Sequence, residues 1–263
     1  SIRAKLYSHA TRRAGSIMIK PKIQPMPDGA ILFDSDLLAT ADARWFDADG
    51  IDGARQQAGR GSVVFFDAPF GACVLRHFQR GGLIARLLKD TYFFTGRKRT
   101  RGFREFTLLA ELHNAGLSVP APVMARYVRR GLRYRADLIT RQIPGAQTLA
   151  ERLKAGTLDA VIATRTGRML AAFHAWGVWH ADLNAHNLLV DGSGQVWLID
   201  FDRCRKRKPA MFWQQANLDR LLRSFRKLQA QRHMADFEDV FWHSLLAAYH
   251  RNLAERYSRG ERA

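Results

Sequence analysis

The sequence predicts an α+β protein with two lobes, a strand-rich first lobe and a mainly helical second lobe. Runs of β-branched and aromatic residues, split by Pro/Gly turns, dominate residues 59–77. Apolar residues recur at helical spacing over 158–176, 212–228 and 237–257. A chain of 263 residues is long enough for two lobes that share a cleft.

Three elements are expected in the first lobe. The runs 63–66 and 72–77 flank a Pro/Gly turn and predict a β-hairpin. Residues 104–114 carry apolar side chains at helical spacing before Gly116, and 134–143 reads as a strand that Pro144-Gly145 stops. We therefore divide the chain into 1–50, an N-terminal extension and start of the first lobe, 51–143, the rest of that lobe, and 144–263, the second lobe.

The second lobe combines helices with one short hairpin. Residues 158–176 predict a helix, and the apolar runs 188–190 and 196–199 are separated by the turn sequence Asp-Gly-Ser-Gly. Helices are expected again over 212–228 and 237–257. The hairpin is thus embedded in a helical lobe.

Charge and cysteine content limit the possible functions. The chain has 42 Lys+Arg against 24 Asp+Glu, a net charge of +18, which predicts an anionic partner such as nucleic acid, a nucleotide or an acidic membrane surface. Cys73 and Cys204 are far apart and lack a Cys/His cluster, so we expect a reduced cytosolic chain without a zinc site. No apolar run reaches the length of about 18 residues that a membrane span needs, so any membrane contact is expected to be peripheral.

The most informative motif is His-Ala-Asp-Leu-Asn-Ala-His-Asn at 180–187, followed by Asp200 after the predicted hairpin. Phosphoryl transfer needs a carboxylate that orients a hydroxyl and accepts its proton, and hard oxygen ligands for Mg²⁺ at the nucleotide phosphates. Asp182 suits the first task, and Asn187 and Asp200 suit the second. The motif therefore predicts an ATP- and Mg²⁺-dependent phosphotransferase.

The spacing H-x-D-x-x-x-x-N, then a hairpin, then Asp, is that of the catalytic loop and metal-binding segment in the protein-kinase-like fold. Asp182 and Asn187 could instead only cap turns, as Asp and Asn often do. Turn capping does not account for Asp200 at the end of the next hairpin strand. We therefore prefer the kinase interpretation.

The first lobe offers candidate nucleotide-binding residues. Gly59 and Gly61 precede a strand and would let backbone N–H groups approach phosphates, although a plain hairpin turn has the same composition. Arg76 stands in the next strand where a kinase would have lysine, and arginine can also bind phosphates. Glu105, near the start of the helix, is expected to pair with Arg76, its alternative being a solvated acid in the first helical turn.

Other residues complete or compete with this set. Glu111 is a competitor of Glu105, although its position suggests a solvent-facing side chain, and Lys89 and Lys98 are less favoured phosphate binders. The adenine is expected beside the strand that links the lobes, at Thr140, Gln142 and Ile143.

Together, these segments resemble the bacterial lipopolysaccharide kinases. The resemblance extends from about residue 59 to 228. The motif D-L-N-A-H-N together with D-F-D is more specific than the general protein-kinase motifs. The segments that carry it are 76–83 (R-H-F-Q-R-G-G-L), 104–109 (R-E-F-T-L-L), 116–122 (G-L-S-V-P-A-P), 182–187 and 200–202.

The resemblance implies a protein-kinase-like fold and ATP-dependent phosphorylation of the Kdo (3-deoxy-D-manno-octulosonic acid) sugar of a lipid A precursor, at its 4-hydroxyl. It further implies a peripheral protein on the cytoplasmic side of the bacterial inner membrane, with the Kdo-lipid A glycolipid and the anionic membrane surface as partners. We expect no nucleic acid and no obligate protein partner. Arg76 matches the sequence motif of this family. Asp202 replaces the glycine of the protein-kinase D-F-G motif, which argues against activation-loop switching of the protein-kinase type.

Basic segments near the predicted cleft are candidates for contact with the polyanionic glycolipid. They are Arg80, residues 97–101 and residues 203–208, each of which could also be an ordinary solvated surface. Among the histidines, His180 is expected to hold the backbone near Asp202, and His186 is a weaker candidate for sugar contact.

Three other functions fit parts of the sequence. A kinase of another core sugar, such as heptose, would share the catalytic residues, and a small-molecule or atypical protein kinase would phosphorylate soluble acceptors. A basic nucleic-acid-binding module without activity is disfavoured because Asp182, Asn187 and Asp200 are all present.

Overall fold

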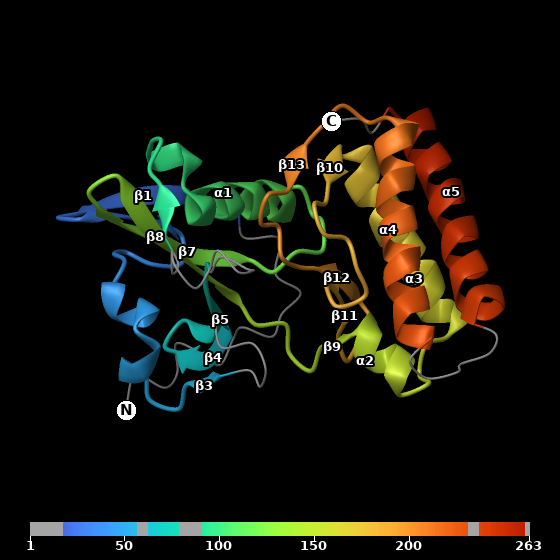
Figure 1. The fold of residues 1–263 in the computed structure, drawn as a ribbon, viewed down its shortest axis with the longest axis horizontal. Helices are drawn as coiled ribbons and strands as arrows, with labels where there is room; N and C mark the ends of the chain where they lie inside the picture. Colours follow the sequence, from blue (N-terminus) through green and yellow to red (C-terminus); the bar gives the residue numbers. More distant parts are fainter. Residues whose placement is uncertain (1–17, 57–62, 79–90, 231–236, 261–263) are drawn as a thin grey trace.

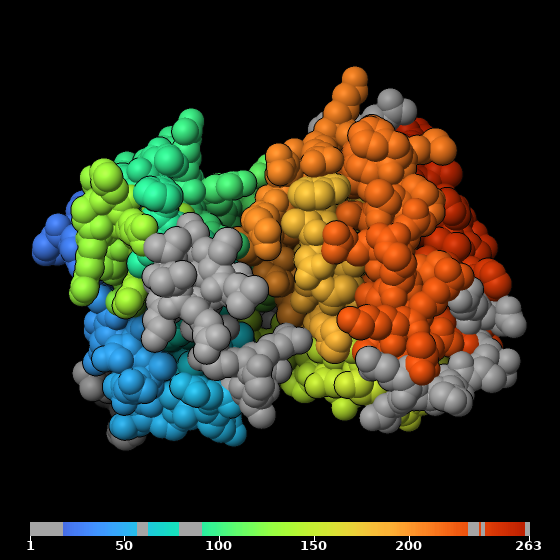
Figure 2. Space-filling model, in the orientation of Figure 1, coloured from blue at the N-terminus to red at the C-terminus, as the bar shows by residue number. Residues whose placement is uncertain are grey.

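A computed structural model describes residues 18–56, 63–78, 91–230 and 237–260. Figure 1 shows the expected two lobes, with a twisted sheet and one long helix on one side and a helical bundle on the other. Short strands lie between them, and in Figure 2 the two lobes form separate masses. The α+β, two-lobed prediction is confirmed.

The first lobe is built on an antiparallel sheet with the strand order β1-β2-β7-β8-β5-β4-β3, and β6 pairs with β8. The predicted hairpin is present as β4 and β5, and the predicted strand before Pro144 is β8. The strands are β1 (Pro21–Met26), β2 (Gly29–Asp34), β3 (Arg55–Gln56), β4 (Val63–Ala68), β5 (Gly71–His77), β6 (Tyr92–Phe93), β7 (Pro122–Arg130) and β8 (Arg133–Arg141).

Several strands of this sheet, among them the short β3 and β6, have no counterpart among the predicted elements. The segment 18–34 forms β1 and β2, which join the sheet through β7. β7 itself lies between β2 and β8, although Pro120 and Pro122 give its start the composition of a turn. Proline is tolerated at the first residue of a strand, so the Pro-rich start does not prevent pairing. A Cβ on Gly29 would lie 1.9 Å from the Tyr127 carbonyl oxygen, so the β2–β7 approach requires glycine there.

Helix α1 (Arg101–Asn114) packs against β7 and β8 and begins three residues before the predicted start at 104. Phe103, Phe106 and Leu109 are on its buried face. Because α1 packs on the sheet through this apolar face, the polar residue Glu105 on the same face is also buried. Short 3₁₀ turns occur at Ala43–Phe46, Ala48–Gly50 and Arg97–Arg99.

The second lobe contains the predicted helices. α3 and α5 pack along each other, and a Cβ on Gly167 would lie 2.2 Å from the Leu245 carbonyl oxygen, so glycine permits their close approach. Thr148 and Glu151 form a capping box at α2, and Asp159 caps α3. The helices are α2 (Leu149–Lys154), α3 (Ala160–Ala175), α4 (Met211–Ala230) and α5 (His243–Ser258), with a π-helical turn at Glu238–Trp242.

Short strands lie between the sheet of the first lobe and the helices of the second lobe. The predicted second hairpin is β11 (Leu188–Val190) with β12 (Val196–Leu198), and β9 (Gln147–Thr148) pairs with β11. β10 (Val178–Trp179) pairs with β13 (Arg205–Lys206), which closes the segment after the hairpin back onto the end of α3. The motif 180–187 therefore lies between two small strand pairs that fix both of its ends.

Cys73 and Cys204 are both buried and free. Across residues 18–56, 63–78, 91–230 and 237–260, no helix has the length and apolar character of a membrane span.

Candidate active site

A cavity of about 900 Å³ lies between the two lobes. Its walls come from β4, β5, α1 and β8 of the first lobe and from the loop 180–187 and the β11–β12 hairpin of the second. A concave site that collects a few polar groups is the usual form of a ligand site. The candidate site residues that line it are Arg76, Glu105, Thr140, Gln142, Ile143, Asp182, His186, Asn187 and Asp200.

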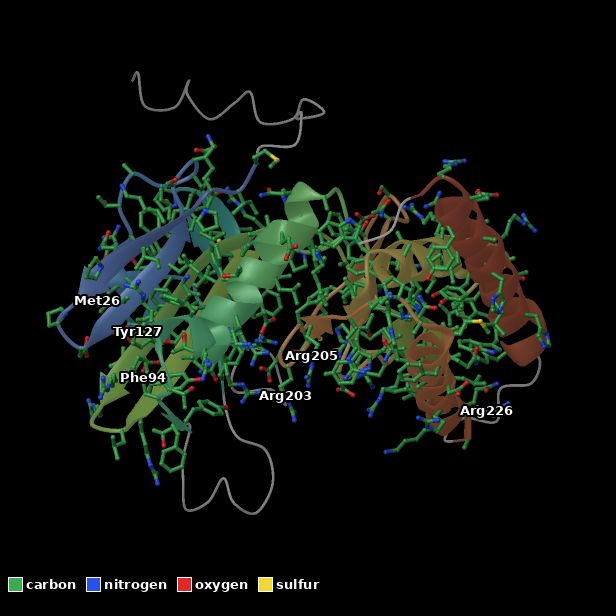
Figure 3. The ribbon with its side chains drawn as sticks, turned by 90° about the horizontal axis from the view of Figure 1, so that it is seen from above. Met26, Phe94, Tyr127, Arg203, Arg205 and Arg226 are labelled. Atoms are coloured by element: carbon green, nitrogen blue, oxygen red, sulfur yellow. The ribbon has the colours of Figure 1, made fainter. Side chains whose placement is uncertain are left out.

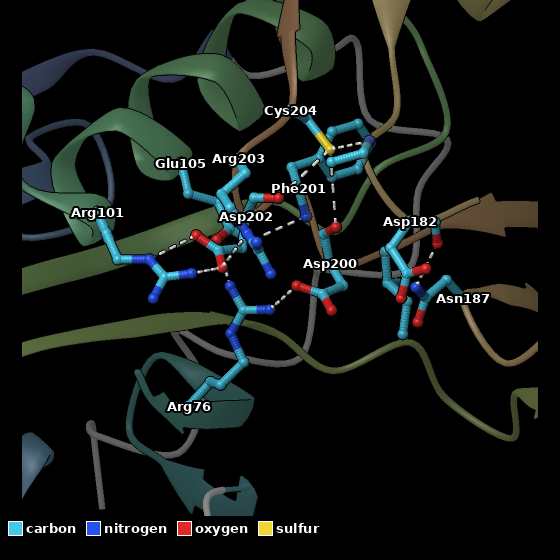
Figure 4. A network of polar contacts seen from close by, with 12 residues as sticks. Arg76, Arg101, Glu105, Asp182, Asn187, Asp200, Phe201, Asp202, Arg203 and Cys204 are labelled. Atoms are coloured by element: carbon cyan, nitrogen blue, oxygen red, sulfur yellow. Dashed lines mark hydrogen bonds and ion pairs between the residues drawn. The ribbon is translucent and has the colours of Figure 1, made fainter. Parts of the chain in front are cut away.

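Three of these residues form an ion-pair cluster that joins the lobes, which we call the Arg76 cluster (Arg76, Glu105 and Asp200). The Arg76 guanidinium on β5 contacts Oε2 of Glu105 on α1 and Oδ1 of Asp200 after β12 (Figure 4). Glu105 is 3% exposed, Arg76 21% and Asp200 39%. The expected Arg76–Glu105 pair is therefore present, and the alternative of a solvated first-turn Glu105 is wrong because α1 starts earlier and buries this side chain.

Burial raises the pKa of Glu105 to about 6, although the Arg76 charge opposes that rise. Burial also acts to lower the pKa of Arg76, but the Glu105 and Asp200 carboxylates outweigh it and hold the Arg76 pKa above its ordinary value. Oε1 of Glu105 also accepts a hydrogen bond of 3.0 Å from the Phe201 backbone N–H. The cluster therefore places one guanidinium between two carboxyl groups and ties α1 directly to the Asp200 segment.

The backbone holds Asp200 in an unusual conformation. Its φ of 62° lies in the left-handed region, and Arg203 has the same φ. A non-glycine residue in this region is uncommon and is kept there only by its surroundings. The preceding residue is fixed on both sides, because Ile199 N–H donates to the Asn187 carbonyl at 3.0 Å and Ile199 O lies 3.1 Å from His180 Nε2. The hairpin thus aims the Asp200 carboxylate into the cavity.

Hydrogen bonds within the loop set the Asp182 and Asn187 side chains. Asn187 Nδ2 donates to the Asp182 carbonyl at 2.9 Å, and Asn184 Nδ2 donates to Asp182 Oδ2 at 3.0 Å. Asn187 is buried, whereas the Asp182 side chain is 61% exposed at the mouth of the cavity. Figure 4 shows Asp182 and Asn187 near each other on this loop. The exposed carboxylate can meet an incoming hydroxyl, and the buried amide can meet the other reactant.

His180 has the structural role that was expected, at a slightly different place. Its Nδ1 accepts from Asp182 N–H at 3.3 Å, so Nε2 carries the proton that is donated to the Ile199 carbonyl. This contact is beside Asp200 and not at Asp202, where we expected it. Burial lowers the pKa of His180, so the ring stays neutral and does not act as a charged group.

The segment expected beside the adenine forms the far wall of the cavity. Thr140 lies on β8, and the next turn carries Gln142 and Ile143 out of the sheet. Gln142 N–H donates to the Ala72 carbonyl at 3.0 Å, so this turn is fixed to β5. Apolar side chains from both lobes, among them Val63, Val74, Leu189 and Ile199, also face this space.

Some predicted residues cannot be placed. Gly59, Gly61, Arg80 and Lys89 lie outside the described residues. Lys98 is described and exposed, but it is not among the residues that line the cavity. Glu111 is half-exposed and pairs with Lys206 Nζ at 2.8 Å, away from the Arg76 cluster, as a solvent-facing position predicts.

Two ion pairs at the site were not foreseen. Arg101 forms a bidentate ion pair with Asp202. The acid at the third position of D-F-D therefore serves here as the partner of Arg101. The Arg101 side chain is only 19% exposed, so it holds the Asp202 segment and is not the surface docking residue we expected. The second pair joins Arg220 Nη1 of α4 to Asp182 Oδ1 at 3.2 Å. Neither could be found from spacing, because the partners are 101 and 38 residues apart.

The basic segment 203–208 lies beside two tryptophans. Lys206 Nζ is 3.8 Å from the centre of the Trp176 ring, and Arg205 and Arg207 lie over Trp179 at 5.4 and 4.1 Å. Cation–π contact orients these side chains without neutralising them, and only Lys206 among the three is also paired with a carboxylate in the described residues, that of Glu111. Arg203, whose side chain is 80% exposed, lies between the lobes next to Arg205 in Figure 3.

The donor set at the cavity suits Mg²⁺. Asn187 uses its amide nitrogen within the protein, which leaves its Oδ1 oxygen for another partner, and Asp200 has one oxygen beyond the Arg76 contact. Mg²⁺ prefers such hard oxygen ligands, and it is usually held by one or two carboxylates together with substrate phosphates. The described residues contain no group of three or more His, Cys, Asp or Glu placed to hold a metal.

Comparison with known proteins decides the family. Residues 46–249, which include most of both lobes and all residues that line the cavity, match the profile of the lipopolysaccharide kinase (Kdo/WaaP) family. The chain belongs to this lipopolysaccharide kinase family. It is therefore a phosphotransferase of lipopolysaccharide synthesis, and the resemblance stated from the motifs is confirmed.

Curated members of the lipopolysaccharide kinase family align over most of the chain. A protein of Stenotrophomonas maltophilia (strain R551-3) is 47% identical over 219 residues, covering 80% of this chain and 85% of that protein. A protein of Xylella fastidiosa (strain 9a5c) is 44% identical over 218 residues, covering 82% and 87%. Both are described as 3-deoxy-D-manno-octulosonic acid kinase.

Solved structures are more distant. WaaP, solved in complex with acyl carrier protein, is 15% identical with a TM-score of 0.47, and the alignment covers 85% of this chain and 96% of that one. The bifunctional kinase-methyltransferase WbdD is 19% identical with a TM-score of 0.44, covering 78% and 47%.

Proposed function

We propose that this chain transfers the γ-phosphate of ATP to the 4-hydroxyl of the Kdo sugar of a Kdo-lipid A precursor, during synthesis of the lipopolysaccharide core. The acceptor is inferred from the curated relatives, which are Kdo kinases at 44–47% identity over most of their length. The reaction class is supported by one observation above all: Asp182, Asn187, Asp200 and Arg76 converge on one cavity between the lobes.

We assign the acceptor end of the reaction to Asp182. Its exposed carboxylate lies at the cavity mouth, where it would hydrogen-bond the sugar hydroxyl, orient it toward the γ-phosphate and take its proton. The bond formed is between the hydroxyl oxygen and the γ-phosphorus, and the bond broken is between that phosphorus and the oxygen of the departing ADP. Asn184 holds the second carboxylate oxygen at 3.0 Å and so limits rotation of the side chain.

We assign the nucleotide end to the Arg76 cluster and the inner wall. Arg76, held by Glu105, would bind phosphate oxygens, and the wall at Thr140, Gln142 and Ile143 would take the adenine. Gly59 and Gly61 are proposed to bring backbone N–H groups to the phosphates. Asn187 and Asp200 would hold Mg²⁺, which when bound would supply positive charge that stabilises the negative charge developing on the transferred group.

We further propose that the protein acts as a peripheral protein on the cytoplasmic face of the inner membrane. The surface that supports this, here called the β13–α4 edge (residues 203–212), combines cations with exposed apolar side chains. Met211 and Phe212 at the start of α4 are 83% and 75% exposed, and only Pro209 and Ala210 separate them from the basic run that ends at Lys208. Cations attracted to anionic lipid beside an apolar pair are the usual components of an interfacial anchor.

Mass spectrometry tests the proposed reaction. Purified protein is incubated with ATP, Mg²⁺ and Kdo-lipid A, and the product should gain one phosphate that fragmentation places on the Kdo ring. A heptosylated acceptor assayed in parallel tests the alternative sugar, and a soluble Kdo glycoside tests whether lipid is required. Faster phosphorylation of heptose than of Kdo would overturn the acceptor assignment while leaving the kinase assignment intact.

A further inference from the structure

We propose that Arg220 is a binding residue for the carboxylate of the acceptor sugar. This inference rests on the proposed function, in which Asp182 orients the acceptor hydroxyl and the acceptor is an acidic sugar. Arg220 donates to Oδ1 of Asp182 at 3.2 Å, and nothing in the sequence motifs or the family description assigns it a role. A guanidinium beside the reacting hydroxyl is well placed to recognise a neighbouring acidic group.

The position of Arg220 is fixed by its helix. Residues 217, 220 and 224 lie on one face of α4, because three- and four-residue steps return to the same side of a helix. Asn217 exchanges two hydrogen bonds with the His180 backbone, at 3.2 and 3.0 Å, and Ser224 Oγ accepts from Ala185 N–H at 2.8 Å. These contacts hold α4 against both ends of the catalytic loop, so the Arg220 side chain leaves the helix directly beside Asp182.

Arg220 lies on the acceptor side of Asp182. The cavity that would hold the nucleotide is lined by Asp182, Asn184 and Arg76, but Arg220 is not among its lining residues. The Arg220 side chain is instead 48% exposed at the outer side of the carboxylate. Arg76 thus supplies the positive charge at the nucleotide, and Arg220 supplies the positive charge where the acceptor would bind.

Both oxygens of the Asp182 carboxylate are occupied in this structure. Arg220 holds Oδ1, and Asn184 holds Oδ2. A sugar hydroxyl that binds Asp182 has to share or replace one of these contacts. An acceptor carboxylate offers Arg220 a second anion, so that the guanidinium can move from Asp182 to the acceptor and release Oδ1 to the hydroxyl.

The chemistry of the sugar matches this exchange. In Kdo the carboxylate is attached to ring carbon 2 and the reacting hydroxyl to ring carbon 4, so both groups belong to the same ring. Within the described residues the remaining N–H donors of Arg220 have no protein partner, and a guanidinium can bind a carboxylate through two parallel hydrogen bonds. The loop 180–187 has no Lys or Arg of its own to do this. An exposed ion pair contributes little to stability, so its exchange is easy.

The test compares two acceptors with the wild-type protein and Arg220→Gln. The acceptors are Kdo-lipid A and the same molecule with its Kdo carboxylate converted to the methyl ester. For the wild type, esterification should lower kcat/KM by about 10- to 100-fold, the loss expected for one charge-assisted contact. Arg220→Gln should lose a similar factor on the acid and show nearly equal kcat/KM for acid and ester, with the KM for ATP unchanged. Arg220→Lys should keep part of the preference.

Arg226→Gln is the matched control, because it removes the same charge from the same helix. Residue 226 is about 120° around the helix axis from residue 220, and Figure 3 places Arg226 well away from Arg203 and Arg205. We expect its acid-to-ester ratio to equal that of the wild type. A melting temperature of Arg220→Gln equal to that of the wild type excludes a folding defect.

Acceptors that lack the lipid A phosphates separate the two anions of the substrate. The effect of Arg220→Gln should persist on them if the sugar carboxylate is the ligand, and it should vanish if a lipid phosphate is. The inference is overturned if Arg220→Gln keeps the wild-type acid-to-ester ratio, or if its effect depends on the lipid phosphates. A wild-type protein that phosphorylates neither acceptor would instead contradict the proposed function.

Discussion

The two ends of the candidate active site are built on opposite principles. At the nucleotide end, the Arg76 cluster joins three segments from both lobes, and its Glu105 carboxylate is buried. At the acceptor end, Asp182 and Arg220 form a single exposed pair within one lobe. Breaking a buried pair leaves an uncompensated charge in the interior, whereas an exposed pair exchanges readily with solvent or ligand. The nucleotide end is therefore preorganised, and the acceptor end can adapt to its substrate.

Asp182→Ala should show the largest effect on activity and almost none on stability. Loss of a positioned proton acceptor is expected to lower kcat by about 10²- to 10⁴-fold. Because the side chain is exposed, the free energy of unfolding should change by no more than about 0.5 kcal/mol. Single-turnover phosphorylation and urea unfolding measure the two quantities. A strongly destabilised Asp182→Ala protein would show that the acceptor end is structural after all.

Glu105→Ala should lower both stability and activity. It leaves Arg76 without its buried partner, which is expected to cost about 3 kcal/mol of unfolding free energy and to raise the KM for ATP. The double variant Arg76→Met/Glu105→Leu removes both charges and should regain most of the stability while remaining inactive. If the double variant is as unstable as the single one, burial of unpaired charge is not the cause.

The β13–α4 edge extends the comparison to the membrane. Arg203→Gln/Lys208→Gln should weaken binding to vesicles of anionic lipid by about 2 kcal/mol, since each cation near such a surface contributes about 1 kcal/mol. Vesicle co-sedimentation at low ionic strength measures this. Phosphorylation of a soluble Kdo glycoside should stay unchanged. Binding of the double variant to anionic vesicles at the wild-type level would argue against docking by this edge.

The pH dependence gives the smallest expected effect. The folded-state pKa of Glu105, about 6, lies above its ordinary value of 4.5. Glu105 therefore gains a proton as the pH falls through about 6, which weakens its ion pair with Arg76 and should lower kcat/KM for ATP a few-fold.

The effect of pH on stability has the opposite sign. The folded state binds this proton more tightly than the unfolded state, so the contribution of Glu105 to the unfolding free energy falls as pH rises from about 4.5 to 6.

Glu105→Gln checks that assignment. It cannot ionise, so the activity of this variant should lose the part of the pH dependence that lies near pH 6, at a lower overall level. The comparison uses the same ATP and Mg²⁺ concentrations for both proteins, because the nucleotide itself titrates in this range. An unchanged profile would place the titration on another group.

Local patterns were sufficient for much of this protein. The hairpin 188–199, the helices of the second lobe and the loop 180–187 are set by turn residues and by the spacing of apolar side chains, which act over a few residues. The same reasoning placed Asp182, Asn187 and Asp200 on neighbouring segments, and it also anticipated the pairing of Arg76 with Glu105. The roles of these residues stay predictions until variants are measured.

Only the tertiary structure decided which distant side chains meet. β7 became a central strand because β2 and β8 pair with it on both sides, and its own Pro-rich start gave no such indication. Arg101 reached Asp202, and Arg220 reached Asp182, because α1 and α4 pack against the segments that carry these acids. Spacing along a chain fixes which face of an element a residue occupies. The packing of one element on another determines what that face touches.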